Sequence, residues 1–323
     1  MDILELKKDM TQEELAEHLG VGRGKVCHML REAREKQKVE YENRKTIHDN
    51  YPDLDDIFEQ LERRKELFDH VSTKQTEVTI GIKEEKHFGV VWWGDHHVGH
   101  VGVDYKAYRD DTLKIRDTEG LYVMGAGDYR ENAIKHRGSH FGEIVPPDIQ
   151  RDIVSRNLIE LREKMLVMIA GCHDSWEKAY TATDFMEELC DVTDSAYLWH
   201  GGEVTIRTGE VDYLWRVRHK YPYQSSLNLE NAMRRINELQ GPCDVAAEAH
   251  LHNDFIMMRP LMGEYRVLMR SGTYKVWDDH CQKQAGWKGY PQFPMVIMSP
   301  HKRELVVAHS IDAGIKILKG LRG

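Results

Sequence analysis

A repeated pattern in the second part of the chain constrains its fold more than any other sequence feature. From about residue 77, short apolar runs alternate with helical patterns such as DIVSRNLIELREKM and LNLENAMRRINELQ. The runs are HFGVVWW, LYVMGA, MLVMIA and CDVAAEA, each six or seven residues long, which is the length of a buried strand. Strands that alternate with helices predict a layered α/β core. The later runs EYRVLMRSGTYKV, FPMVIMS and ELVVAHS are expected to be antiparallel strands that complete a second sheet.

Side chains that can bind metal ions follow the predicted strands. In chain order they are Asp95 and His97, Asp128, Cys172 with His173 and Asp174, His219, and the pair His250 and His252. Open α/β sheets place their sites at the carboxyl ends of strands, and glycines beside these residues permit the sharp turns required there. Carboxylate and imidazole groups suit a pair of divalent ions about 3.5–4 Å apart. The candidates span about 160 residues, which argues against a compact structural zinc site.

The order of these motifs resembles that of the calcineurin-like metallophosphoesterase superfamily, including its DNA-repair exonucleases. DxH, GDxx, a GNHD-like GCHD, a lone histidine and HxH follow one another between about residues 86 and 275. Ser271-Gly272-Thr273 stands where that family has a small-residue turn. The resemblance implies an α/β fold in the form of a four-layer α/β/β/α sandwich of two mixed sheets. It also implies a metal-dependent phosphoesterase.

The resemblance further implies a role for each motif residue. One ion would be held by Asp95, His97 and His252, a second by Cys172, His219 and His250, and Asp128 would bridge the two. His173 would protonate the leaving oxygen or steady the transition state, with Asp174 orienting its imidazole. The implied cofactors are two divalent ions, with Mn²⁺ favoured and Fe, Zn, Mg or Ni as alternatives.

Two of these assignments have alternatives in the sequence. Cys172 replaces the asparagine that is usual in the family. As a thiolate it would favour a softer metal and be sensitive to oxidation. The alternative is that it does not bind metal and packs as a small hydrophobic residue, as buried cysteines often do. His200 is a rival to His219. The loop after Asp128 carries Arg130, His136 and Arg137, which are candidates for contacting substrate unless the loop is simply a solvated basic segment.

The N-terminal segment has a different character. Thr11 and Glu14 form a capping box, and Gly20 is expected to end the first helix before a second one with Val26, Met29, Leu30 and Ala33 on one face. This arrangement resembles the small helix-turn-helix modules of bacterial regulators. A small all-α module over 1–40, a charged helical connector over 41–76 and a catalytic domain over 77–323 are therefore predicted. Arg23, Lys25 and Arg31 are candidates for DNA contacts; a protein-interaction module is the alternative.

Composition narrows the functional classes. The 323 residues carry a formal net charge of −9 and five scattered cysteines, which suggests a cytoplasmic protein in a reducing compartment. Its apolar runs are shorter than the roughly 18 residues that a membrane span requires, so we expect no membrane association. The favoured function is a DNA nuclease, either exo- or endonuclease, with DNA as partner. The alternatives are a phosphatase or phosphodiesterase on protein, nucleotide or small esters, and a DNA-binding scaffold with weak activity. The sequence predicts no oligomeric state.

Overall fold

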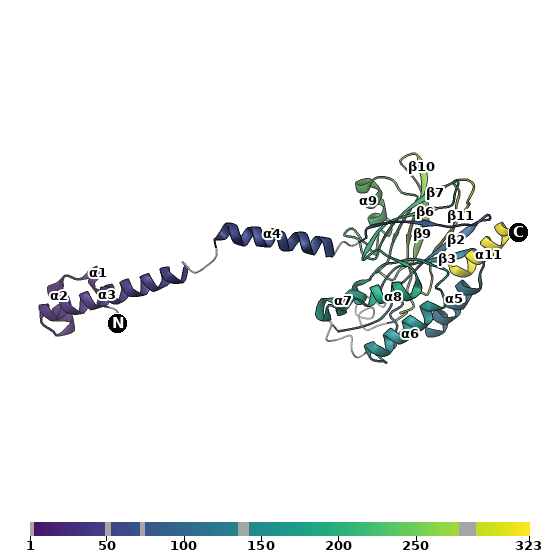
Figure 1. Cartoon of the computed structure of the whole chain (residues 1–323). Coiled ribbons are helices and arrows are strands. Elements are labelled where there is room, and N and C mark those ends of the chain that lie inside the picture. The colour runs from purple at the N-terminus through teal and green to yellow at the C-terminus, as the bar shows by residue number, and fades with distance from the viewer. Residues whose placement is uncertain (1–2, 49–52, 72–74, 135–141, 278–288) are drawn as a thin grey trace. The chain divides into compact units, whose positions relative to one another are not determined.

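The computed structural model describes residues 3–48, 53–71, 75–134, 142–277 and 289–323 (Figure 1). The chain divides into two compact units, residues 1–73 and 74–323. Within the described ranges, each helix is either too short or too polar to cross a lipid bilayer.

The first unit begins with helices α1 (Ile3–Asp9) and α2 (Gln12–Leu19). The expected capping box is present, since the Thr11 side chain accepts from the Glu14 amide while the Glu14 carboxylate accepts from the Thr11 amide at 2.7 Å. Gly20 ends α2 with a left-handed φ of 62°, which glycine adopts at no steric cost. Leu15 packs with Val26 and Leu30 of the next helix in a small buried core.

Helix α3 (Arg23–His48) extends further than expected. The predicted boundary at residue 40 falls inside it, because residues 31–48 contain neither glycine nor proline and are rich in Glu, Lys and Arg, which favour helix. Helix α4 (Leu54–Val71) follows within the segment expected to be a charged helical connector.

The second unit contains two sheets, each with six strands over the described residues. The first sheet has the order β12 (Leu305–Ala308), β11 (Met295–Met298), β2 (Phe88–Trp93), β3 (Leu121–Gly125), β4 (Met165–Met168) and β5 (Ala196–Tyr197). The second has the order β1 (Glu77–Gly81), β6 (Gly201–Arg207), β7 (Asp212–Arg218), β8 (Val245–Glu248), β10 (Glu264–Arg270) and β9 (Phe255–Leu261). Both sheets are mixed, with β2, β3, β4 and β5 parallel in the first and β7, β8 and β10 parallel in the second.

Helices cover the outer faces of the two sheets (Figure 1). Those packed on the first sheet are α5 (Tyr105–Asp117), α6 (Pro147–Ile159), α8 (Phe185–Thr193) and α11 (Ile311–Arg322), while α9 (Asn231–Gln240) packs on the second. Strand β2 shows the layering residue by residue: Val91 and Trp93 face the helices, whereas Val90 and Trp92 join the core between the sheets. The predicted α/β/β/α sandwich is confirmed.

The expectation that the last strands complete one second sheet was wrong. Strand β10 lies in the second sheet, parallel to β8, but β11 and β12 belong to the first sheet, where β11 pairs antiparallel with β2. Alternate residues of β11 enter two different cores, Met295 on the helix side and Val296 between the sheets. A strand buried on both faces needs an interior position, and the apolar run alone does not specify in which sheet.

Candidate metal centre

The loops that follow β2 and β3 lie side by side at one end of the first sheet. The Asp95 amide donates to the Gly127 carbonyl at 2.8 Å, and the His97 amide donates to the Asp128 carbonyl at 3.0 Å. The loop after β8 joins them from the second sheet, since the His250 amide donates to Asp95 Oδ2 at 3.0 Å. The strand-end residues of the two sheets therefore meet at one site.

Asp95, His97 and His252, the residues implied for the first ion, form one of four groups among the described residues that could hold a cation. Another of the four groups is His97, Glu131 and His173. The Nε2 atoms of His97 and His252 lie 3.0 Å apart, and Nε2 of His252 lies 3.7 Å from Asp95 Oδ1. Oδ2 of Asp95 accepts from the Ser271 hydroxyl at 2.9 Å as well as from the His250 amide, so its Oδ1 faces the imidazoles.

The second group consists of Cys172, His219 and His250. Cys172 Sγ lies 3.8 Å from Nδ1 of His250. His219 Nδ1 donates to the Ala126 carbonyl at 2.8 Å, which directs its Nε2 into the site. The rival His200 is occupied elsewhere, with Nδ1 at 3.0 Å from the Ala170 carbonyl. Cys172 is the first residue of helix α7 (Cys172–Thr181), the element that follows β4 in the chain.

Asp128 lies between the two groups. Its Oδ2 is 3.1 Å from Nε2 of His219 and 3.9 Å from Nε2 of His97, while its Oδ1 accepts from the His173 amide at 2.8 Å. A carboxylate with one oxygen facing an imidazole from each group has the position of a bridging ligand.

Two buried polar atoms in this cluster have no hydrogen-bond partner among the described residues, Asp95 Oδ1 and His219 Nε2. Buried polar atoms are rarely left unsatisfied. Both atoms face the site, and the surrounding donors are carboxylate oxygens, imidazole nitrogens and a thiol. This donor set fits divalent cations, so the residues present can hold metal ions.

The electrostatics of the site agree with this fit for His97, His250 and Asp128. Burial lowers the pKa of both His97 and His250 to about 4, which keeps these imidazoles neutral and able to ligate at pH 7. Burial opposes ionisation of Asp128, but the nearby imidazole of His219 outweighs it and holds the pKa of that carboxyl well below its usual range. His219 and Asp95 differ. Burial lowers the pKa of His219, but the Asp128 carboxylate outweighs it and holds that pKa well above its usual value, while burial raises the pKa of Asp95 to about 7. A cation bound by these two residues would therefore displace protons from them.

His173 lies beside the metal-ligand groups, and its imidazole is held by main chain. Its Nδ1 donates to the Glu131 carbonyl, and its ring lies 4.0 Å from the Trp176 ring, measured between centroids. The expected contact with Asp174 was wrong. The Asp174 carboxylate instead accepts from the backbone amides of Asp128 at 2.7 Å, Gly171 at 2.9 Å and Tyr129 at 3.2 Å. The Gly171 amide is an unpaired amide at the start of α7, and the other two amides belong to the adjacent loop after β3, so the carboxylate turns towards the main chain.

Sequence reasoning missed Glu131. Its carboxylate contacts His97 Nδ1 at 2.9 Å, and Lys275 Nζ lies 3.2 Å from both of its oxygens. Burial raises the pKa of this carboxyl, but the hydrogen bond to His97 lowers it more, so the net pKa is lowered. A possible signal was its position three residues after Asp128, within the same loop.

The predicted substrate contacts have different outcomes. Arg130 was expected in a basic loop, but it is 1% exposed, its guanidinium pairs with Glu177 at 2.7 Å, and it stacks 4.0 Å above the Phe185 ring. That expectation was wrong, because Phe185 and Glu177 enclose the side chain. His136 and Arg137 lie outside the described residues.

The backbone of the site is as unusual as its side chains. Five implied ligands have left-handed φ angles, namely Asp95 (51°), His97 (49°), Asp128 (53°), His250 (77°) and His252 (60°). Such angles are uncommon for residues other than glycine and gather at functional sites. Gly171 has a different function, because a Cβ at that position would overlap the Asp128 carboxylate.

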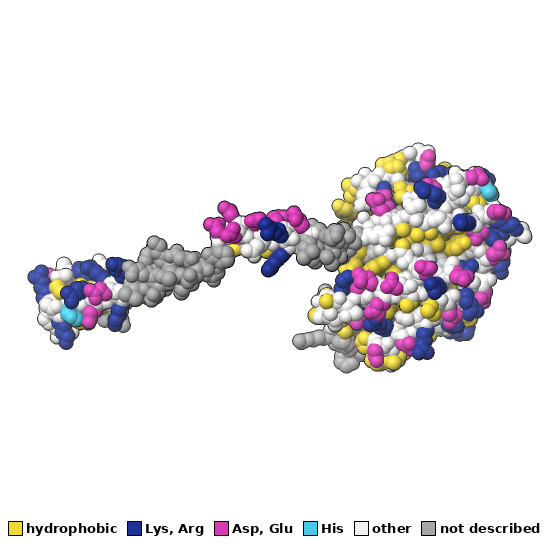
Figure 2. All heavy atoms as spheres, in the orientation of Figure 1, with side chains coloured by type: hydrophobic (Ala, Val, Ile, Leu, Met, Phe, Trp, Pro, Cys, Tyr) yellow, Lys and Arg dark blue, Asp and Glu magenta, His cyan; other side chains and the backbone are white. Residues whose placement is uncertain are grey.

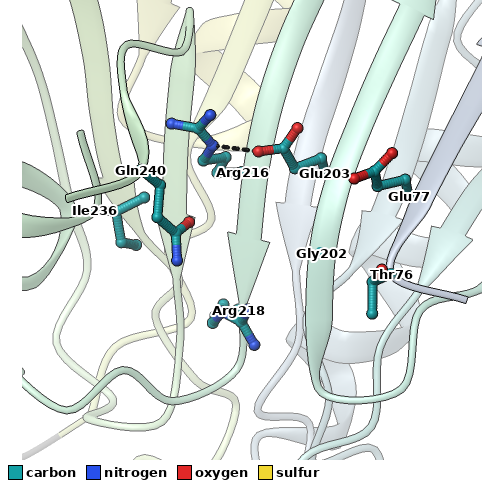
Figure 3. Close-up of a pocket in the computed structure, with 8 residues that line it drawn as sticks. All are labelled: Thr76, Glu77, Gly202, Glu203, Arg216, Arg218, Ile236 and Gln240. Atoms are coloured by element: carbon teal, nitrogen blue, oxygen red, sulfur yellow. Dashed lines mark hydrogen bonds and ion pairs between the residues drawn. The ribbon is translucent and has the colours of Figure 1, made fainter. Parts of the chain in front are cut away.

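A separate pocket of about 170 Å³ lies between β1, β6, β7 and α9 (Figure 3). Its lining includes the ion pair of Glu203 with Arg216 at 2.7 Å, but none of the implied metal ligands.

Comparisons with known proteins returned neither a matching family model nor a curated relative. The structure is similar to two solved structures among others. One is Vps29 of Chaetomium thermophilum, at 12% identity over 68% of this chain and 96% of that one, with a TM-score of 0.37. Another is the calcineurin-like phosphoesterase YfkN from Bacillus subtilis, at 10% identity over 72% of this chain and 92% of that one, with a TM-score of 0.39. Because identities and TM-scores are both low, the proposals below rest on the chain's own residues.

Proposed function

We propose that this chain is a binuclear-metal-dependent phosphoesterase that hydrolyses phosphodiester bonds, with DNA as its substrate. The observation that carries the proposal is the position of Asp128 Oδ2, 3.1 Å from Nε2 of His219 and 3.9 Å from Nε2 of His97. One carboxylate thus serves two three-residue groups, as a pair of ions sharing a ligand requires.

The first ion, for which Mn²⁺ is favoured, would be held by Asp95, His97 and His252, and the second by Cys172, His219 and His250. When bound, the two ions would supply an activated water and offset phosphate charge during in-line displacement. The residues themselves fix the ligand geometry and, through burial of Asp95, His97 and Asp128, exclude bulk water from one side of the site.

His173 is proposed to donate a proton to the leaving oxygen. Its Nδ1 proton is engaged by the Glu131 carbonyl, so Nε2 is the atom available to substrate. In the imidazolium form Nε2 carries a second proton, and the carbonyl keeps the ring oriented while that proton leaves. Stacking against Trp176 limits rotation of the ring.

The first unit supports DNA as the substrate. Arg23, Lys25 and Arg31 lie on the exposed surface of α3, and Lys and Arg side chains are prominent on the visible face of this unit (Figure 2). Arg23 pairs with Glu13 at 2.6 Å and Arg31 with Glu35 at 3.9 Å, both on the surface. An ion pair on the surface contributes little to stability, so these guanidinium groups can exchange their carboxylate partners for DNA phosphates.

A phosphatase or phosphodiesterase acting on small esters is the second candidate. The burial of Arg130 favours it, because one of the cations expected to follow a DNA backbone is enclosed within the protein.

Cleavage assays separate these candidates. The assays compare three proteins: wild type, Asp128→Ala and the control Asp152→Ala. The control removes an exposed carboxylate that pairs with Arg156 on α6. Each protein is incubated with Mn²⁺ and labelled single- and double-stranded DNA, and in parallel with bis(4-nitrophenyl) phosphate. We expect wild type and the control to cleave both substrates and Asp128→Ala to cleave neither. Cleavage of the small diester alone would remove DNA as substrate, and inactivity of wild type with metal bound would remove the enzyme proposal and favour a scaffold.

A further inference from the structure

We propose that Glu131 and Lys275 form a buried pair that positions His97 for the first metal ion, an inference that rests on the proposed function. Neither residue belongs to the implied ligand set. Both are buried beside it, Glu131 in the loop after β3 and Lys275 in the segment after β10.

The first step of the argument is the tautomer of His97. Its Nδ1 lies 2.9 Å from Glu131 Oε2, and the side chains of the two residues are 2% and 0% exposed. A carboxylate only accepts hydrogen bonds, so Nδ1 carries the proton and donates it. In the neutral ring Nε2 then presents a lone pair, and this atom faces Nε2 of His252 at 3.0 Å. Glu131 thereby fixes both the tautomer and the ring orientation that ligation needs.

The second step concerns the charge of Glu131. A fully buried carboxylate is costly unless it is paired. Lys275 supplies the pairing, with Nζ at 3.2 Å from both Glu131 oxygens and a side chain that is 8% exposed. The carboxylate therefore stays ionised and close to His97 without an ion in the site.

The third step ties Lys275 to the ligand loops. The Lys275 amide donates to Thr273 Oγ1 at 3.0 Å, and that hydroxyl donates to the Asp95 carbonyl at 2.7 Å. The pair thus joins the loop that carries Asp95 and His97 to the loop that follows Asp128. A pair with a merely structural role would contribute to folding without affecting the affinity for metal.

Side chain and main chain of Glu131 have separable roles. Its carbonyl accepts from His173 Nδ1, whereas its carboxylate contacts His97. Substitution by glutamine keeps the carbonyl and a similar volume but removes the charge. Glu131→Gln therefore tests the contact with His97 while leaving the support of His173 in place.

The experiment measures Mn²⁺ affinity by equilibrium titration and the melting temperature of the metal-free protein. The variants are Glu131→Gln, Glu131→Gln with Lys275→Met, and the control Glu203→Gln, which removes a carboxylate paired with Arg216 at 2.7 Å in the separate pocket. Losing an outer hydrogen bond of this kind weakens metal binding about 10–100-fold in general. Glutamine removes the charge but keeps an amide oxygen that can accept from His97 Nδ1, so its effect is expected at the low end of that range. We expect a decrease of about tenfold for the ion that His97 would hold, in the single and double variants, and none in the control.

The metal-free melting temperature distinguishes positioning from folding. It should fall in Glu131→Gln, where Lys275 loses its partner, and recover in the double variant, where no buried charge remains. Mn²⁺ affinity equal to wild type in the folded single or double variant would overturn the positioning role. Failure of wild type itself to bind Mn²⁺ would instead overturn the proposed function together with this inference.

Discussion

The carboxylate of Asp174 accepts a hydrogen bond of 2.7 Å from the backbone amide of Asp128. The acid next to His173 thus supports the loop that carries Asp128, the proposed bridging ligand, while the imidazole of His173 is held by a main-chain carbonyl. This relationship changes what substitution of Asp174 should do.

Asp174→Ala should destabilise the protein. Three buried amides, those of Asp128, Tyr129 and Gly171, would lose their acceptor. Since an unsatisfied buried donor costs about 1–3 kcal/mol, and water can reach some of them once the side chain is gone, we expect the free energy of unfolding to fall by about 3 kcal/mol. Urea denaturation of the metal-free protein measures it. Unchanged stability combined with a lost rate would return Asp174 to a catalytic role.

The cysteines should differ in reactivity towards iodoacetamide at pH 8. Burial raises the pKa of Cys190 and of Cys243 to about 12, so both remain protonated thiols and should stay unlabelled, whereas the exposed Cys27 should react. Half-buried Cys172 should react slowly in the metal-free protein and be protected once Mn²⁺ or Zn²⁺ is added. Peptide mapping by mass spectrometry reads each site separately. Equal labelling of Cys172 with and without saturating metal would exclude it as a ligand.

Replacing Arg23, Lys25 and Arg31 together by alanine should weaken DNA binding without slowing cleavage of the small diester. Each phosphate that the variant no longer neutralises should reduce the slope of log affinity against log salt by about 1. Fluorescence anisotropy at several salt concentrations measures that slope. The control replaces exposed Lys106, Arg156 and Lys302 of the second unit and changes net charge equally. If both triple variants are weakened to the same extent, bulk charge rather than α3 is responsible.

Arg130→Met should lower the stability of the protein and leave substrate binding unchanged. It removes the partner of Glu177 and the stacking on Phe185. The Glu177 side chain is 23% exposed and can be partly rehydrated. We therefore expect the free energy of unfolding to fall by about 2 kcal/mol, which is less than the cost of breaking a fully buried ion pair. The KM for bis(4-nitrophenyl) phosphate should stay within about twofold of wild type, since the effect is on folding. A raised KM at unchanged stability would restore Arg130 as a substrate contact.

The gathering of the implied ligand residues at one site could be predicted because it depends on local sequence. Asp95 and Asp128 each follow a glycine after a buried strand, and strand ends meet at one edge of a sheet. His200 and His219 could not be separated in this way. They flank the paired ends of β6 and β7, where Gly201 lies opposite Arg218, so both reach the same region. Which of the two histidines belongs to the site depends on which imidazole ring points into it, and contacts with neighbouring loops determine the orientation of each ring.

Burial of charged loop residues could not be predicted for a related reason. Arg130 and Glu131 are consecutive charged residues in a loop, a pattern typical of solvated surface. Their partners Glu177 and Lys275 are distant in sequence, on a helix and after a strand of the other sheet. The sequence of the loop itself does not indicate those partners.

The left-handed backbone at five implied ligands has a kinetic consequence. Each residue with such a φ angle raises the conformational free energy of the folded protein by about 1–3 kcal/mol, and this already applies to the metal-free protein. An entering cation would then find its donors already aimed, so its capture would be governed by the shedding of hydration water rather than by rearrangement of the polypeptide. The preformed site also restricts which residues can occupy these positions. A β-branched residue in place of Asp95 or His252 would remove the ligand atom and would disfavour the left-handed backbone at that position.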